Sequence, residues 1–382
     1  MRLGVNALFL EPGMGGLETY VREVVPRLAG MNGVSSVAVV CNPRGAQLLR
    51  GEPWAGEVQL VEAPVMGRRG LRAVSELTLV GALASRRFDV LLSPAMTAPL
   101  ATRAANVVLL ADVIWLLFPD LGDGNPVTAR LWRALVPAVA RRCDRVIALT
   151  ESAAGELSAF LGVERARIDV VGLGFDARPA GEVTPEEQLR GQLGIGEAPV
   201  ILNVGAKKVH KNQMRLVEAV ATLQPSYPGL QLVLPGAPTA YDETLRRRAE
   251  ELGISDEVKF PGYVDAADLE GLYRLADCLA FPSLSEGFGL PVLEAMAREL
   301  PVVCSDTSAL PEVVGEAAVL VDPTSVSEIA RGISAVLADS GLRERLVGAG
   351  RVRLSGFTWD RCAELTMESL ERAMLGKQAA RS

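Results

Sequence analysis

Histidine and lysine are scarce in this sequence of 382 residues, which holds one histidine, His210, and five lysines. A single histidine argues against a Ser-His-Asp triad and against a histidine-based metal site. The cysteines are odd in number, far apart and without a CxxC pair, and most stand in apolar runs (Cys41, Cys143, Cys278, Cys304 and Cys362). We interpret them as buried thiols, with a catalytic role as the alternative.

Long apolar runs and an excess of positive charge are also missing. No run approaches the roughly 20 residues that span a bilayer. Residues 1–13 are typical of a first β-strand and not of a signal peptide, so we expect a cytoplasmic protein. The net charge is −7. Because surfaces that bind phosphate backbones usually make a domain basic, nucleic acid is not an expected partner, and any phosphate site must be local.

What the sequence does contain is a regular alternation of short apolar runs and amphipathic helical patterns. Such alternation is typical of parallel sheets with crossover helices and predicts an α/β protein. We expect strands within 3–10, 34–42, 58–65, 89–95, 106–114 and 144–150, and then within 199–205, 230–236, 258–263, 278–283, 301–306 and 317–322. The length favours two domains.

A stretch rich in glycine and proline, residues 172–199, interrupts this alternation and indicates an interdomain linker. We therefore predict two doubly wound domains, residues 1–175 and 199–357, with a linker at 176–198 and a terminal helical segment at 358–382. Ligands of open α/β sheets bind beyond the carboxyl ends of the strands, and pockets favour domain interfaces. The candidate residues should thus lie just after strands.

The first candidate is the loop EPGMGGLETY, which follows the first expected strand and opens a helix. Gly13, Gly15 and Gly16 would let backbone N–H groups approach a phosphate. The dinucleotide pattern GxGxxG would need a glycine at position 18, where the chain has Glu18, so the NAD fingerprint fails. A plain tight turn is an equally good interpretation of this loop.

The second candidate is NVGAKKVHKNQ, which follows the strand expected in 199–205. Three of the five lysines, Lys207, Lys208 and Lys211, stand here beside His210. The local charge is therefore opposite to that of the whole chain and suits a diphosphate. A solvated turn with basic residues is the alternative.

The third candidate is SEGFGLPVLEAM, in which a loop leads into a helix. Gly287 and Gly289 would expose backbone N–H groups at the positive end of the helix, so an anion would fit between Glu286 in the loop and Glu294 in the helix. The two carboxylates would then accept hydrogen bonds from sugar hydroxyls on one side and ribose hydroxyls on the other. The alternative is an exposed loop acid and an ordinary helix residue. No third carboxylate adjoins the pair, which disfavours a metal site.

Together these segments resemble the retaining, nucleotide-sugar-dependent glycosyltransferases of family 4, which have the GT-B fold. The likeness extends from SEGFGLPVLEAM to GGLETYVREVVPRL, ADVIWLLFPD, RVIALTESAAGEL, NVGAKKVHKN and FPGYVDAADLEGLYRLAD, and so covers nearly the whole chain. It implies two Rossmann-like, doubly wound α/β domains facing a central cleft, with the C-terminal helix crossing back to the first domain. The implied activity is transfer of a hexose-type sugar from a nucleotide-diphosphate sugar to a glycan, lipid-linked or small-molecule acceptor.

The resemblance also implies ten donor-binding residues: Gly15, Gly16, Lys207, Lys211, Glu286, Gly287, Phe288, Gly289, Leu290 and Glu294. Among them, Glu286 would hold the transferred sugar and Lys211 the diphosphate, and these two would be catalytic. Leu290 would offer its N–H to the diphosphate, and Glu294 would bind the ribose hydroxyls. The nucleotide sugar would be a co-substrate, with neither cofactor nor metal ion.

Two positions depart from the family pattern. A histidine usually precedes the aspartate of the ADVIWLLFPD segment, and here Ala111 precedes Asp112. An arginine usually stands five residues before the lysine, and here that place holds Ala206, with Lys207 beside it as a substitute. The alternatives are therefore a nucleotide-sugar-binding member that is weakly active or depends on a partner, and a different two-domain enzyme such as a dehydrogenase or a sugar-nucleotide epimerase.

The donor base, the donor sugar and the acceptor are left open by the sequence. Arg68, Arg69 and Arg72 form a basic stretch that would either contact anionic lipid, as a peripheral membrane protein does, or lie on a solvated face. Asp112 and residues 150–152 would either face the cleft or cap helices, and TESAAGEL fits a helix N-terminus.

Overall fold

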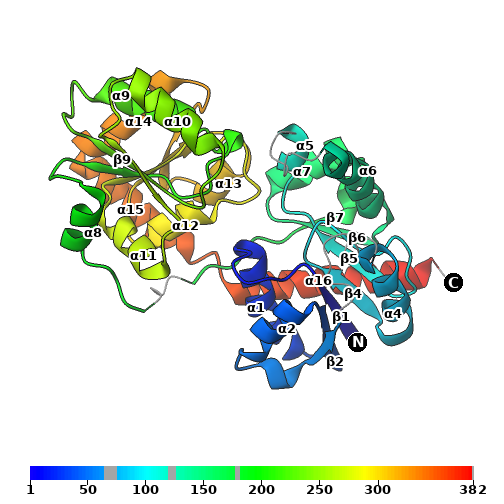
Figure 1. Cartoon of the computed structure of the whole chain (residues 1–382). Helices are drawn as coiled ribbons and strands as arrows, with labels where there is room; N and C mark the ends of the chain where they lie inside the picture. The colour runs from blue at the N-terminus through cyan, green and yellow to red at the C-terminus, as the bar shows by residue number, and fades with distance from the viewer. Residues whose placement is uncertain (64–74, 119–125, 177–180, 381–382) are drawn as a thin grey trace. The chain divides into compact units, whose positions relative to one another are not determined.

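The computed structural model describes residues 1–63, 75–118, 126–176 and 181–380. The basic stretch Arg68, Arg69 and Arg72 lies outside these residues. The chain forms two compact units, Met1–Gly174 with Phe357–Ser382 and Phe175–Gly356, which are described separately below (Figure 1).

The described part of the first unit contains a seven-stranded parallel sheet of order β3-β2-β1-β4-β5-β6-β7. Its strands are β1 (Arg2–Ala7), β2 (Ser36–Cys41), β3 (Gln59–Glu62), β4 (Val90–Ser93), β5 (Ala105–Leu109), β6 (Arg145–Ala148) and β7 (Ile168–Val170). Its helices are α1 (Gly16–Ala29), α2 (Pro43–Arg50), α4 (Leu79–Arg87), α5 (Ile114–Leu117), α6 (Pro126–Arg142), α7 (Glu151–Leu161) and α16 (Trp359–Ala379). Helices α1 and α16 pack on one face of the sheet, and α4, α6 and α7 on the other.

The second unit contains a six-stranded parallel sheet of order β10-β9-β8-β11-β12-β13 within its described residues. Its strands are β8 (Val200–Leu202), β9 (Gln231–Pro235), β10 (Val258–Gly262), β11 (Cys278–Phe281), β12 (Val302–Ser305) and β13 (Ala318–Val321). Its helices are α8 (Glu186–Leu193), α9 (Gln213–Leu223), α10 (Tyr241–Glu251), α11 (Ala266–Leu275), α12 (Leu290–Ala297), α13 (Leu310–Val314), α14 (Val326–Ala338) and α15 (Ser340–Leu354). Figure 1 shows α9, α10 and α14 on one face of this sheet and α11 and α12 on the other.

The prediction of two Rossmann-like α/β units is confirmed, and a strand overlaps each of the expected ranges. The central strands β4, β5, β8, β9, β11 and β12 are buried along their whole length. Helices on both faces remove such strands from water, so their sequences are continuous apolar runs. Five thiols are buried and free, as expected from their apolar contexts.

The C-terminal helix α16 returns to the first unit, and hydrogen bonds to the buried Asp169 fix it there. Asp169 on β7 accepts hydrogen bonds from Ser369 Oγ at 2.7 Å and Arg372 Nη1 at 2.7 Å, both on α16, and from Arg145 Nε at 2.8 Å. Burial opposes the charge of Asp169, but these donors outweigh it and lower the pKa of the carboxyl below its usual value. The expected crossing of the helix to the first domain is thereby confirmed.

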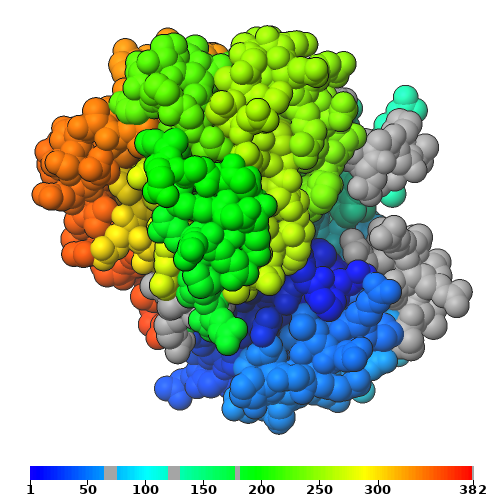
Figure 2. Space-filling model, turned by 60° about the vertical axis from the view of Figure 1, so that its left-hand side comes forward, coloured from blue at the N-terminus to red at the C-terminus, as the bar shows by residue number. Residues whose placement is uncertain are grey.

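The stretch expected to be a linker holds a helix, α8. Leu189 of α8 is buried, and the helix packs against α11, as Figures 1 and 2 show. A left-handed residue, Gly194, ends the helix, and Gly271 of α11 lies so close that an added Cβ would be 2.5 Å from the carbonyl oxygen of Thr184. Within the stretch expected to be a linker, Gly194 therefore serves a helix end, while Gly271 of α11 allows the close approach of the backbone at Thr184.

No helix in the described ranges combines the length and the apolar character needed to cross a membrane.

Candidate functional site

The order of the second sheet reverses between β8 and β11, which makes this the topological switch point where doubly wound proteins bind ligands. The loop after β8 carries the lysine segment, and the loop after β11 carries the SEGFG segment. Two hydrogen bonds join the loops: the backbone N–H of Leu284 donates to the carbonyl of His210 at 2.7 Å, and the side-chain Nδ2 of Asn212 donates to the carbonyl of Pro282 at 2.9 Å. The two candidate segments therefore form one site.

Lys211 and Glu286 form the centre of this site. Lys211 Nζ lies 2.6 Å from Glu286 Oε1, and both side chains are largely buried, with 18% and 9% of their surface exposed. The ammonium also lies 4.9 Å from the centre of the Phe281 ring, within the range of a cation–π contact. Holding the lysine between a carboxylate and an aromatic face fixes a positive charge at the carboxyl end of β11.

Two other basic residues of the segment, Lys207 and His210, are buried. Lys207 is buried and its Nζ donates to the carbonyl of Gly236 at 3.0 Å. Burial lowers the pKa of Lys207, and burial with the nearby Lys211 and Lys208 lowers the pKa of His210 to about 3. His210 is therefore neutral at physiological pH, which corrects its assignment to a basic cluster.

The loop that carries Glu286 is fixed by a residue that sequence reasoning missed. Ser308 Oγ accepts the N–H of Glu286 at 3.1 Å and donates to its carbonyl at 2.9 Å. Ser308 follows β12 and has φ of 59°, an uncommon conformation for a residue other than glycine. No motif at Ser308 indicates this contact, because it depends on the neighbouring strand.

Helix α12 begins directly after the glycines of the SEGFG loop. Gly289 precedes the first helical residue with φ of 107°, which favours glycine, and Phe288 beside it is buried. Leu290 opens the helix, where a backbone N–H has no carbonyl one turn earlier to bond to. Gly287 lies three residues before Leu290, in the same loop as Glu286. These four predicted donor-binding residues thus line the amino end of α12.

Glu294 is the fifth residue of α12, just after the first turn, and is half-buried. Its Oε2 accepts a hydrogen bond from Tyr273 Oη at 2.6 Å. Sequence reasoning identified Glu294 but not Tyr273, whose place in the FPGYVDAADLEGLYRLAD segment carries no chemical signal of its own. Among the described residues, no three histidine, cysteine or acidic side chains gather in a way that would hold a metal ion.

Gly15 and Gly16 belong to the first unit, at the start of α1. Gly15 has φ of 63° and ψ of −134°, a conformation that requires glycine. Glu18 Oε2 accepts hydrogen bonds from the N–H groups of Gly13 at 2.8 Å and Met14 at 3.2 Å. Glu18, which stands where the NAD fingerprint needs a glycine, therefore stabilises the conformation of this loop. Contact of Gly15 and Gly16 with a donor stays a prediction.

The polar residues that follow β5 and β6 bond to helix ends. Thr150 Oγ1 accepts the N–H of Ala153 at 3.1 Å and so caps α7. Asp112 Oδ1 accepts the N–H of Ile114 at 3.0 Å, at the start of α5, and Glu151 forms an ion pair with Arg165. Capping is therefore the observed role of Thr150. Ala111, which precedes Asp112 in the sequence, is half-buried.

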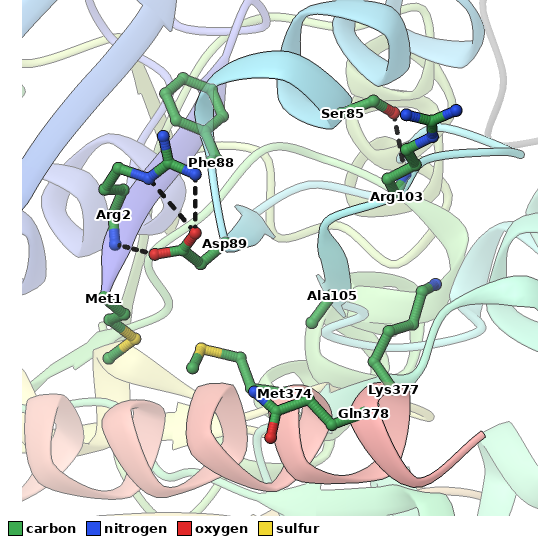
Figure 3. A pocket seen from close by; sticks show the side chains of 10 residues that line it. All are labelled: Met1, Arg2, Ser85, Phe88, Asp89, Arg103, Ala105, Met374, Lys377 and Gln378. Atoms are coloured by element: carbon green, nitrogen blue, oxygen red, sulfur yellow. Dashed lines mark hydrogen bonds and ion pairs between the residues drawn. The ribbon is translucent and has the colours of Figure 1, made fainter. Parts of the chain in front are cut away.

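A hollow of about 520 Å³ lies elsewhere in the first unit, at the amino ends of β1, β4 and β5 and beside α16. Figure 3 shows Arg2 and Asp89 paired on one wall, 2.8 Å apart, and Lys377 of α16 on another. Lys377 in turn lies 3.0 Å from Asp144 Oδ2. The hollow lies at the amino ends of the strands, opposite to the end of the sheet that binds ligands in α/β proteins, so we do not assign the substrate to it.

The fold and the site define a class: doubly wound α/β proteins with a candidate ligand site at a switch point of the sheet. Comparison with known families makes this specific. Residues 185–353 match the glycosyl transferases group 1 family, and residues 15–174 match the glycosyl transferase 4-like domain. A D-inositol 3-phosphate glycosyltransferase of Salinispora arenicola is 30% identical over 409 residues, covering 94% of this chain and 88% of that protein. The chain belongs to the GT4-like group 1 glycosyltransferases, which excludes the dehydrogenase and epimerase alternatives.

Other relatives agree with this assignment. O-antigen chain mannosyltransferase B of Escherichia coli is 36% identical over 172 residues, which are 44% of each chain. Among solved structures, Anabaena HepE in complex with UDP-glucose has a TM-score of 0.73 at 21% identity, covering 97% of this chain and 99% of that one. Sucrose-phosphate synthase from Thermosynechococcus elongatus has a TM-score of 0.72 at 20% identity over the full length of both chains. At these identities the structures establish the GT-B fold alone.

Proposed function

We propose that this glycosyltransferase transfers a hexose-type sugar, with retention of configuration, from a nucleotide-diphosphate sugar to a glycan, lipid-linked or small-molecule acceptor. The observation that carries the proposal is the buried pair of Lys211 and Glu286, 2.6 Å apart at the amino end of α12. The mannosyltransferase and D-inositol 3-phosphate glycosyltransferase relatives support transfer of a sugar, and the UDP-glucose bound to HepE supports a nucleotide-sugar donor.

Each part of a nucleotide sugar has a matching group in the site. Lys211 and the N–H of Leu290 would bind the diphosphate, at the helix end that carries about half a positive charge. Glu286 would accept hydrogen bonds from the sugar hydroxyls, beside the backbone of the loop 287–289. Glu294, which lies further along the chain in α12, would accept hydrogen bonds from the ribose hydroxyls. We assign neither a cofactor nor a metal ion to the reaction.

The proposed reaction needs no protein nucleophile. The bond between C1 of the sugar and the diphosphate oxygen breaks, and the acceptor oxygen bonds to C1 from the same face. The acceptor proton passes to the departing phosphate oxygen. The protein's main task is then to stabilise negative charge on the leaving diphosphate, which Lys211 does from a fixed position.

Glu294→Ala is expected to weaken binding of UDP or GDP by roughly 10- to 100-fold, because hydrogen bonds to a charged acceptor are worth about 1.5–3 kcal/mol. Isothermal titration calorimetry measures the dissociation constants. Glu218→Ala serves as the matched control, since Glu218 is a helical glutamate of the same unit whose carboxylate binds Arg248 at 2.9 Å. Unchanged affinity in the Glu294 variant would remove this residue from the site.

Turnover itself is tested by incubating the protein with UDP-, GDP- and dTDP-sugars and a panel of acceptors, and measuring the nucleoside diphosphate released. Release in at least one combination is expected. Ala111 and Ala206, which replace a usual histidine and arginine, favour a second candidate function: a nucleotide-sugar-binding protein that is weakly active or depends on a partner. Binding without release in every combination would establish that second function instead.

Ala111→His is expected to raise turnover modestly, by less than about tenfold. A preorganised hydrogen-bond donor contributes about 10²–10³-fold to the rate, and a histidine added by mutation supplies at most a fraction of that. The rate of nucleoside diphosphate release measures this. A lower rate in the variant would mean that the alanine makes room for substrate.

A further inference from the structure

Two contacts join α11 to α12 beside Glu294. Tyr273 of α11 donates to Glu294 Oε2 at 2.6 Å. One turn earlier on α11, Glu270 accepts from Arg298, the residue that ends α12, through Nε at 2.8 Å and Nη2 at 2.5 Å. Arg298 Nη1 also donates to the carbonyl of Glu294 at 2.9 Å. Glu294 is thus held through both its side chain and its backbone.

The ring of Tyr273 is fixed as firmly as its hydroxyl. Tyr273 is 1% exposed, and the guanidinium of Arg298 lies 5.1 Å from the centre of its ring. Arg274 Nε lies 3.0 Å from the second oxygen of Glu270, which balances the remaining charge of that carboxylate. The phenol therefore has one buried position, from which it reaches Glu294.

We propose that Tyr273 is a positioning residue for donor recognition: it binds one oxygen of the Glu294 carboxylate and so aims the other at the ribose hydroxyls of the nucleotide. This inference rests on the proposed function. A glutamate side chain has three rotatable bonds, and ordering it on binding costs free energy that a contact made beforehand avoids. Tyr273 and Glu294 come from different helices, and only their packing brings them together.

The protonation state of the phenol fits this role. Burial, together with the charge of Glu294, raises the pKa of Tyr273 well above its usual range. The phenol therefore keeps its proton throughout the working pH range and always donates to the carboxylate. A phenylalanine in its place keeps the ring and its contact with Arg298 but removes the donor.

The test compares UDP and GDP with their 2′,3′-dideoxy counterparts, on the full chain, by calorimetry. Tyr273→Phe is expected to weaken UDP or GDP binding by about 2- to 10-fold. This factor corresponds to the cost of ordering one side chain, that of Glu294, when the nucleotide binds. Its affinity for the dideoxy nucleotide should equal that of the unmodified protein. Glu294→Ala and Glu294→Ala/Tyr273→Phe should bind UDP or GDP equally weakly, because the tyrosine acts only through the glutamate.

Tyr227→Phe is the matched control, since Tyr227 Oη lies 3.0 Å from Ser334 Oγ in the same unit, on α14. It should bind all nucleotides as the unmodified protein does. Because the ratio of the two dissociation constants is taken within one variant, a partly unfolded sample does not change it. Equal weakening of the ribose and dideoxy nucleotides by Tyr273→Phe, or no weakening of either, would overturn the inference alone. Failure of the unmodified protein to bind any of them would overturn the proposed function.

Discussion

Lys211→Ala is expected to lower the rate of sugar transfer by about 10²–10³-fold, the usual effect of removing one preorganised donor to a developing charge. The ammonium is held by Glu286 at 2.6 Å and by the face of Phe281, so its position is set before the donor binds. A preset charge needs no reorganisation as the diphosphate departs. The measurement is kcat for nucleoside diphosphate release, at saturating nucleotide sugar.

The neighbouring lysine gives a matched control for this prediction. Lys208 stands in the same segment but is exposed, and Lys208→Ala should keep kcat near that of the unmodified protein. Lys211→Arg retains the positive charge and should recover only part of the rate, because the larger, planar guanidinium places that charge differently from the compact ammonium between Glu286 and Phe281. Equal rates for Lys211→Ala and Lys208→Ala would contradict the catalytic assignment of Lys211.

The strands were predictable because each central strand is a short, continuous apolar run, which the helices on both faces of a parallel sheet require. The one described strand that the sequence did not indicate is β7, with three residues, of which the middle one is Asp169. A buried aspartate in a strand is intelligible only with its partners on β6 and α16 in place. Local pattern does not contain that information.

The site was predictable in its parts more than in its arrangement. The SEGFG loop and the lysine segment were identifiable because glycines, a helix start and a reversed local charge stand together in the sequence. Contact between Lys211 and Glu286, 75 residues apart, follows from strand order, which places β8 beside β11. The supporting contacts of Ser308 and Tyr273 follow from neighbouring elements, and the neutral state of His210 follows from burial.

Asp169→Ala is expected to lower the free energy of unfolding of the first unit by about 3–5 kcal/mol, because it leaves the buried Ser369 hydroxyl and the largely buried Arg145 guanidinium without their acceptor. All four tryptophans, Trp54, Trp115, Trp132 and Trp359, belong to this unit. Their fluorescence during denaturant unfolding therefore follows the first unit and not the second. The matched control is Asp89→Ala, which breaks an exposed pair with Arg2 and should cost about 0–1 kcal/mol.

The effect of Asp169→Ala should also depend on pH in a defined direction. The pKa of Asp169 is lower in the folded protein than its ordinary value of 3.8. A carboxyl with a lowered pKa contributes stability that is fully present above its unfolded pKa and is lost as the pH falls through its folded pKa. The difference between the unmodified protein and Asp169→Ala should thus be constant near neutral pH and shrink below about pH 4. A difference that stays the same down to pH 2 would show that α16 is not held through the charge of Asp169.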